Sequence, residues 1–169
     1  DRSNQPFLSK DKSKILIFNG EIYNYKELKK NLQDKNIEFT TNSDTEVLLE
    51  LINYFGINDA LNKIDGMFSF AYYDKLKKKI FLARDRLGEK PLIYYFNNNR
   101  FLFCSEIKNN SELEDHKLDI DWKKIDYFNR FSFIASPNTI YKNYNKLEPG
   151  ELLIIDTLNE LKIKKTQYW

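Results

Sequence analysis

Residues that support metal, disulfide and nucleophile chemistry are scarce in this sequence. Its 169 residues include one cysteine, Cys104, and one histidine, His116. A single cysteine excludes an internal disulfide and a cysteine-based zinc site, and a single histidine excludes most histidine-dependent metal and triad chemistry. With only five glycines and four prolines, the chain also has little room for flexible linkers.

Long apolar runs and an excess of one charge are missing as well. No apolar run approaches the roughly 20 residues of a membrane-spanning helix, and no signal peptide is visible. We therefore expect a cytoplasmic protein that does not bind a membrane. The 27 basic and 25 acidic residues leave a net charge of +2 and are interspersed, which argues against a nucleic-acid-binding arm.

The residues that are abundant indicate one packed domain. Hydrophobic residues make up 41% of the sequence and aromatic residues 15%, which favours an ordered, β-containing fold. The length suits a single domain over residues 1–169. Because the sequence begins at Asp1 in the middle of a pattern, we expect it to be a fragment of a longer protein.

The pattern of apolar residues predicts an α+β layered domain rather than a doubly wound parallel sheet. Continuous apolar residues at 15–18 indicate a buried strand, which we expect to end at the turn pair Asn19-Gly20 and to lead into a helix. The later predicted elements are hairpins over 67–83 and 92–104, a helix over 120–131, and a strand pair over 151–155 and 161–165.

Two capping boxes predict where the first helices begin. Asn24 and Glu27 have the spacing of an N-cap residue and its reciprocal partner, and so do Ser43 and Glu46. Gly56 is a suitable terminator for the second helix.

The Asn19-Gly20 pair is a candidate catalytic element. A tight turn at this place can aim a side-chain amide and a backbone N–H at one point, so Asn19 Nδ2–H and Gly20 N–H could stabilise an oxyanion. Gly20 allows close approach of a substrate because it has no Cβ, and Glu21 would lie beside that substrate. The alternative is a plain turn between a strand and a helix.

Asp44 is a candidate binding residue in the first turn of the second helix. A carboxylate there can simply complement the helix dipole. It can also bind a cationic ligand group such as an α-ammonium.

Several ordered motifs together resemble class II glutamine amidotransferases, specifically the glutaminase domain of glutamine-hydrolysing asparagine synthetases. The resemblance covers essentially the whole chain. Its motifs are Gln5-Pro6, Asn19-Gly20-Glu21-Ile22-Tyr23-Asn24, Ser43-Asp44-Thr45-Glu46, Asp65 to Ala71, Ala83 to Leu92, Phe103 to Lys108, Ser136 to Tyr141, Lys146 to Gly150 and Tyr168-Trp169. The Glu21-Ile22-Tyr23-Asn24 continuation looks like the asparagine synthetase branch, which also includes enzymes that amidate sugars or other carboxylates.

The resemblance implies an N-terminal nucleophile (Ntn) hydrolase-type αββα sandwich with antiparallel sheets, truncated here at the N-terminus. In this family an N-terminal cysteine attacks the glutamine carboxamide, with its own α-amine as base, and ammonia is released. By the same resemblance, Asn19 and Gly20 match the oxyanion hole. Asn19, Gly20, Glu21 and Asp44 match glutamine-binding positions, with Asp44 taking the substrate α-ammonium.

The implied partners are L-glutamine and a C-terminal synthetase domain, with a homodimer as a possible assembly and no nucleic acid. No cofactor or metal is implied for this domain, whereas ATP and Mg²⁺ are expected in the synthetase domain, where aspartate would be amidated. Because the nucleophilic cysteine segment and the synthetase domain are absent from these residues, we expect the fragment alone to be inactive. The alternatives are an amidotransferase for a sugar or other carboxylate acceptor and a non-catalytic binding relative.

Two further patterns have structural explanations. Cys104 follows Phe101-Leu102-Phe103, where a small buried hydrophobic residue is expected rather than a nucleophile. Arg84-Asp85-Arg86 could suggest a phosphate site, but we expect an ion-pair network that stabilises a turn.

Overall fold

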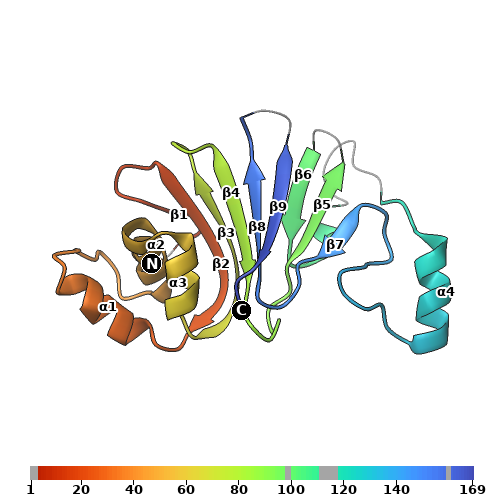
Figure 1. The fold of residues 1–169 in the computed structure, drawn as a ribbon, viewed down its shortest axis with the longest axis horizontal. Helices are drawn as coiled ribbons and strands as arrows, with labels where there is room; N and C mark the ends of the chain where they lie inside the picture. The colour runs from red at the N-terminus through yellow and green to blue at the C-terminus, as the bar shows by residue number, and fades with distance from the viewer. Residues whose placement is uncertain (1–3, 98–99, 111–117, 159–160) are drawn as a thin grey trace.

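The structure is a computed structural model that describes residues 4–97, 100–110, 118–158 and 161–169, so His116 lies outside the described residues. Two antiparallel sheets form its centre (Figure 1). The larger sheet has the order β1-β2-β3-β4-β8-β9, with β1 (Phe7–Leu8), β2 (Lys14–Ile22), β3 (Gly66–Asp74), β4 (Lys79–Arg84), β8 (Glu151–Asp156) and β9 (Lys162–Gln167). The smaller sheet has the order β6-β5-β7, with β5 (Ile93–Asn97), β6 (Arg100–Cys104) and β7 (Tyr144–Lys146).

Helices lie on the side of the larger sheet that faces away from the smaller sheet (Figure 1). They are α1 (Tyr25–Gln33), α2 (Asp44–Phe55) and α3 (Ile57–Lys63). A 3-10 helix, η1 (Ile107–Asn110), follows β6, and α4 (Trp122–Phe131) lies beyond the smaller sheet and buries none of its residues. No helix in the described part of the chain is long and apolar enough to cross a membrane.

The alternation of side chains along the strands produces two hydrophobic cores. Leu16, Phe18 and Ile22 of β2 point to one face and are buried against α2 residues such as Val47 and Leu48. The second core fills the space between the sheets and consists of Ala71, Leu82, Leu92, Tyr94, Leu147, Leu153 and Ile155. The larger sheet is therefore covered on both faces, which confirms the predicted α+β layered arrangement.

The local predictions from hairpins and caps are mostly confirmed. β3 pairs with β4, β5 with β6, and β8 with β9, as the strand patterns predict. The predicted helix at 120–131 begins two residues later, because Asp121 is its N-cap and Ile120 pairs with Tyr141 instead. The sequence did not predict the short elements β1, α3 and β7.

The two predicted capping boxes have different outcomes. The Ser43 side chain accepts from Glu46 N at 3.3 Å, as predicted, and α2 ends at Gly56. The cap by Asn24 is wrong, because its side chain donates to Lys63 O at 2.9 Å and accepts from Asp65 N at 3.0 Å. Asn24 therefore joins the start of α1 to the segment before β3 instead of capping its own helix.

The predicted turn at Asn19-Gly20 is also wrong, because β2 continues to Ile22. Gly20 pairs with Phe68 and Ile22 with Gly66 in an uninterrupted antiparallel ladder. Gly20 has φ +149°, and a Cβ on it would lie 2.1 Å from Met67 O and 2.7 Å from Phe68 Cα. The glycine is needed for the close approach of two strands and not for a reversal of the chain.

Candidate functional site

The free edge of β2 beyond β1 carries most of the predicted site residues. β1 pairs only with Ile15 and Leu16. Beyond this pairing, the Gln5 side chain continues the ladder, because its Oε1 accepts from Phe18 N at 2.6 Å and its Nε2 donates to Phe18 O at 2.7 Å. Further along, Ile22 N donates to Asp44 Oδ2 at 3.1 Å. Two side chains thus satisfy the backbone on either side of Gly20.

The peptide groups of Gly20 face this edge. The N–H and C=O of its partner Phe68 point toward β4 instead of toward β2. Phe68 N donates to Asp85 Oδ2 at 3.3 Å, and Phe68 O accepts from Asp85 N at 2.8 Å. Gly20 and Phe68 therefore form a narrow pair without mutual hydrogen bonds. As a result Gly20 N–H points away from β3, and no group among the described residues bonds to it.

The Asn19 side chain points to the face of β2 that lies toward the smaller sheet, opposite to the face that carries Phe18. Its Nδ2 donates to Ser105 Oγ at 3.3 Å, just after the end of β6. Both residues line a cavity of about 330 Å³ between the sheets, together with Ile17, Ser69, Phe70, Ala71, Leu92, Phe103 and Cys104. The second amide hydrogen and the Oδ1 of Asn19 have no partner among the described residues.

Asp44 is held in place by the first turn of α2. Behind it, the buried Glu46 carboxylate accepts from Thr40 N at 2.8 Å and from Thr41 N and Oγ1, each at 2.6 Å. Burial alone would raise the pKa of Glu46, but these hydrogen bonds outweigh it and lower that pKa. The fixed loop leaves the Asp44 carboxylate directed at Ile22 N.

Glu21 is exposed and lies on the same face of β2 as Asn19, two residues away. Its carboxylate is one of the negative charges near the exposed Tyr23 side chain. Desolvation and then the neighbouring charges of Glu89 and Glu21 raise the pKa of the Tyr23 hydroxyl. An acidic surface of this kind attracts cations.

The structure therefore brings the predicted residues to one end of β2 but does not join them directly. Asn19, Gly20 and Glu21 are consecutive, and Asp44 reaches them through the backbone of Ile22. Among the described residues no hydrogen bond links Asp44 to Asn19, Gly20 or Glu21. The sequence assigned no role to Ser105 or Gln5, which appeared only as parts of motifs.

The Arg84-Asp85-Arg86 segment is not the ion-pair network that we expected. Arg84 donates to three carbonyls, those of Gly88, Leu147 and Lys90, at 2.6 to 2.8 Å. The buried Asp85 carboxylate accepts from the backbone N–H groups of Phe68, Leu87, Glu89 and Lys90. Of these three residues, Arg86 alone forms an ion pair with another described residue, Asp65, at 3.8 Å. These charges satisfy backbone groups of the loop that have no partner in a strand or helix.

Cys104 lines the inter-sheet cavity and is partly exposed, so it is less enclosed than the sequence suggested. Among the described residues no group of three or more His, Cys, Asp and Glu side chains could hold a metal ion.

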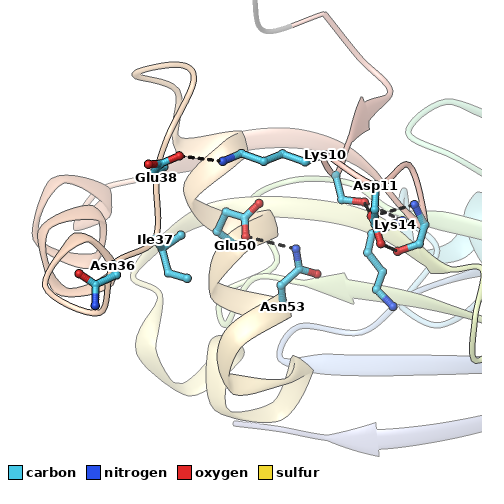
Figure 2. Close-up of a pocket in the computed structure, with 10 residues that line it drawn as sticks. Lys10, Asp11, Lys14, Asn36, Ile37, Glu38, Glu50 and Asn53 are labelled. Atoms are coloured by element: carbon cyan, nitrogen blue, oxygen red, sulfur yellow. Dashed lines mark hydrogen bonds and ion pairs between the residues drawn. The ribbon is translucent and has the colours of Figure 1, made fainter.

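A second cavity of about 430 Å³ lies away from the predicted site, between the loop before β2, the residues that precede α2, and α2 itself (Figure 2). It is lined by Ser9, Lys10, Asp11, Ser13, Lys14, Asn36, Ile37, Glu38, Glu50 and Asn53. Hydrogen bonds from Ser13 and Ser9 keep the pKa of Asp11 well below its usual value, whereas burial raises that of Glu50. Figure 2 shows Lys10 paired with Glu38, whereas the Glu50 carboxylate accepts from the neutral Asn53 amide at 3.4 Å.

The arrangement of two antiparallel sheets, covered by helices and with polar groups at the end of β2, matches known proteins. Residues 1–169 match the family described as a glutamine amidotransferase domain, and the chain belongs to this family. Among solved structures, the chain resembles the glutamine phosphoribosylpyrophosphate amidotransferase from B. subtilis, with a TM-score of 0.67 and 24% identity over 98% of this chain and 32% of that chain. This likeness confirms the Ntn hydrolase-type fold.

Two curated relatives are similar in sequence. A putative glutamine-hydrolysing asparagine synthetase of Methanocaldococcus jannaschii is 43% identical over 157 residues, which cover 92% of this chain and 30% of the relative. Asparagine synthetase 2 of Bacillus subtilis is 40% identical over 171 residues, which cover 98% of this chain and 22% of the relative. The motif resemblance to their glutaminase domain is thereby confirmed. The chain spans less than a third of the length of either relative.

Proposed function

We propose that this chain binds L-glutamine at the edge of β2 and stabilises the oxyanion that forms when the glutamine carboxamide is attacked. The observation that carries this proposal is Gly20 N–H, which has no partner within the described part of the chain although the backbone of Phe18 and of Ile22 on either side is satisfied by Gln5 and Asp44. A preorganised N–H donor at a strand edge is a common element of oxyanion holes. Asn19 supplies the second donor from the neighbouring residue.

Asp44 and Glu21 bind the amino-acid part of the substrate in this proposal. Asp44 is fixed at the start of α2, and its second carboxylate oxygen, Oδ1, has no hydrogen-bond partner among the described residues. That oxygen can accept from the α-ammonium of glutamine as a charge-assisted hydrogen bond. Glu21 adds negative charge on the same side.

The reaction that fits the family is glutamine hydrolysis coupled to amide synthesis. The nucleophile would be a cysteine that is not among these 169 residues, since Cys104 is their only thiol. Ammonia would pass to a synthetase domain in which ATP and Mg²⁺ activate aspartate, and a cytoplasmic homodimer is the assembly we propose. Aspartate is preferred over a sugar or another carboxylate because the curated relatives are named asparagine synthetases.

The test is Asn19→Ala in the full-length protein that contains this chain. We expect the kcat of glutamine hydrolysis to fall by roughly 10²–10³, because the amide acts when charge develops on the carbonyl oxygen. KM should change much less, and amide synthesis from free ammonia should continue. Asn62→Ala, on the exposed surface of α3, is the matched control and should change neither activity.

Other outcomes contradict the proposal. If both activities fall together with the melting temperature, Asn19 has only a structural role. If both fall at an unchanged melting temperature, Asn19 couples the two domains instead. Unchanged glutamine hydrolysis would remove Asn19 from the site altogether.

A further inference from the structure

Ser105 makes a contact that links the two sheets at the proposed site. It follows β6 of the smaller sheet, whereas Asn19 lies in β2 of the larger sheet. Ser105 Oγ accepts from Asn19 Nδ2 at 3.3 Å, although the residues are 86 positions apart. Within the described residues, neither side chain has another hydrogen-bond partner.

A carboxamide that makes no contact can rotate about its last side-chain bond, because that torsion is broad. The Nδ2 group carries two hydrogens. When one of them is donated to a fixed oxygen, the plane of the amide is set and the direction of the other hydrogen is set with it. An oxyanion donor needs this kind of preorganisation.

We propose that Ser105 is a positioning residue for the oxyanion hole. Its hydroxyl holds one amide hydrogen of Asn19, so that the second hydrogen is presented to the carbonyl oxygen of glutamine together with Gly20 N–H. This inference rests on the proposed function and extends it to a residue outside the motif that carries Asn19.

The surroundings of this contact support the role of Ser105. The cavity around it is lined mainly by apolar side chains, such as Ile17, Phe70 and Leu92, which offer the Asn19 amide no alternative hydrogen-bond partner. Ser69 also lines the cavity, but its hydroxyl already donates to Pro91 O at 3.2 Å. Ser105 is therefore the hydroxyl in this cavity that holds Asn19.

The experiment measures both activities of the full-length protein with Ser105→Ala and Ser105→Thr. Ser105→Ala should lower the kcat of glutamine hydrolysis roughly 3- to 10-fold, which corresponds to the loss of one hydrogen bond, and leave KM and ammonia-dependent synthesis unchanged. Ser105→Thr keeps the hydroxyl and should restore most of the rate. Ser13→Ala also removes a side-chain hydrogen bond, at the other end of β2 about 20 Å from Asn19, and should have no effect.

A double-mutant cycle decides whether Ser105 acts through Asn19. In the Asn19→Ala background, Ser105→Ala should cause no further loss of kcat. A further loss of the same size, an unchanged kcat in the single variant, or a fall of both activities with the melting temperature would each overturn the inference. If instead Asn19→Ala leaves glutamine hydrolysis intact, the proposed function itself has failed.

Discussion

At the scale of single residues, the side chains at the proposed site can each form more than one hydrogen bond. Asp44 gives one carboxylate oxygen to Ile22 N and keeps Oδ1 for a ligand. Asn19 gives one amide hydrogen to Ser105 and keeps the other. Each residue is thus oriented by the protein through one atom while a second atom remains for the substrate.

The substitution Asp44→Asn separates the hydrogen bond to Ile22 N from the binding of a ligand. The variant keeps an oxygen that can accept from Ile22 N but loses the charge that pairs with the α-ammonium. Because that pairing is the same in the ground state and the transition state, we expect KM for glutamine to rise about tenfold or more and kcat to change little. Steady-state kinetics of the full-length protein measure both constants.

Asp59→Asn is the control for this variant, since Asp59 also lies in the first turn of a helix but is exposed, and among the described residues no hydrogen bond joins it to β2. It should leave KM unchanged. An unchanged KM in Asp44→Asn would mean that Asp44 serves only the helix dipole and the backbone of Ile22.

At the scale of elements, the start of α2 depends on a carboxylate that accepts hydrogen bonds from the preceding loop. Glu46 accepts four hydrogen bonds from Thr40 and Thr41, and its own N–H is capped by Ser43. We expect Glu46→Gln to lower the free energy of unfolding at neutral pH by about 2 kcal/mol, because the new NH₂ group faces donors instead of accepting from them.

The effect of Glu46→Gln should depend on pH. Folding lowers the pKa of Glu46 below its ordinary value of 4.5, so the carboxylate contributes stability above that pH, and the contribution disappears as the pH falls through the folded-state pKa. Urea titrations of both proteins from pH 7 to pH 3 should therefore converge at the acidic end. The exposed Glu27→Gln, in the first turn of α1, should show no such convergence. A constant difference at every pH would contradict this account.

The β2–β3 pair depends on Gly20 in a different way. Gly20→Ala places a Cβ 2.1 Å from Met67 O, so the strands must separate. Gly56 also has a positive φ, +82°, but a Cβ there meets nothing within 4 Å. Gly56→Ala should cost about 1–3 kcal/mol from backbone strain alone, and Gly20→Ala should cost clearly more. If chemical denaturation gives the same loss in free energy of unfolding for both variants, the close contact between β2 and β3 does not determine the cost at Gly20.

At the scale of the whole molecule, side-chain hydrogen bonds to backbone carbonyls join the ends of strands that are distant in the sequence. Arg84, at the end of β4, donates to Leu147 O after β7, and Tyr168 donates to Arg84 O at 2.6 Å after β9. These bonds close the end of the sandwich near which β2 terminates. The site therefore rests on segments from both halves of the chain.

We expect the 169-residue chain alone to bind glutamine weakly and to release no glutamate above the uncatalysed background. The reason is its lack of an N-terminal cysteine with a free α-amine as base, since Cys104 lies within β6 and its α-nitrogen is part of a peptide bond. A coupled glutamate assay, with circular dichroism to verify folding, measures this. Release that is abolished by Cys104→Ser would contradict both this expectation and the structural role of Cys104.

The sequence by itself determined the features that depend on neighbouring residues. Ser43 caps α2, Gly56 ends it, and the hairpins follow their turns, because each of these signals acts within a few residues of the chain. The order of motifs also sufficed to place the chain in its family. These features require no knowledge of what packs against them.

The tertiary structure alone decided which groups of the site are free and which are held. Asn24 has a capping sequence but bonds to Lys63 and Asp65, and Asn19-Gly20 has a turn sequence but continues a strand. The freedom of Gly20 N–H follows from its register with Phe68, and the orientation of Asn19 follows from Ser105. Local patterns do not encode such partners, because contacts between distant segments are fixed by the packing of whole sheets.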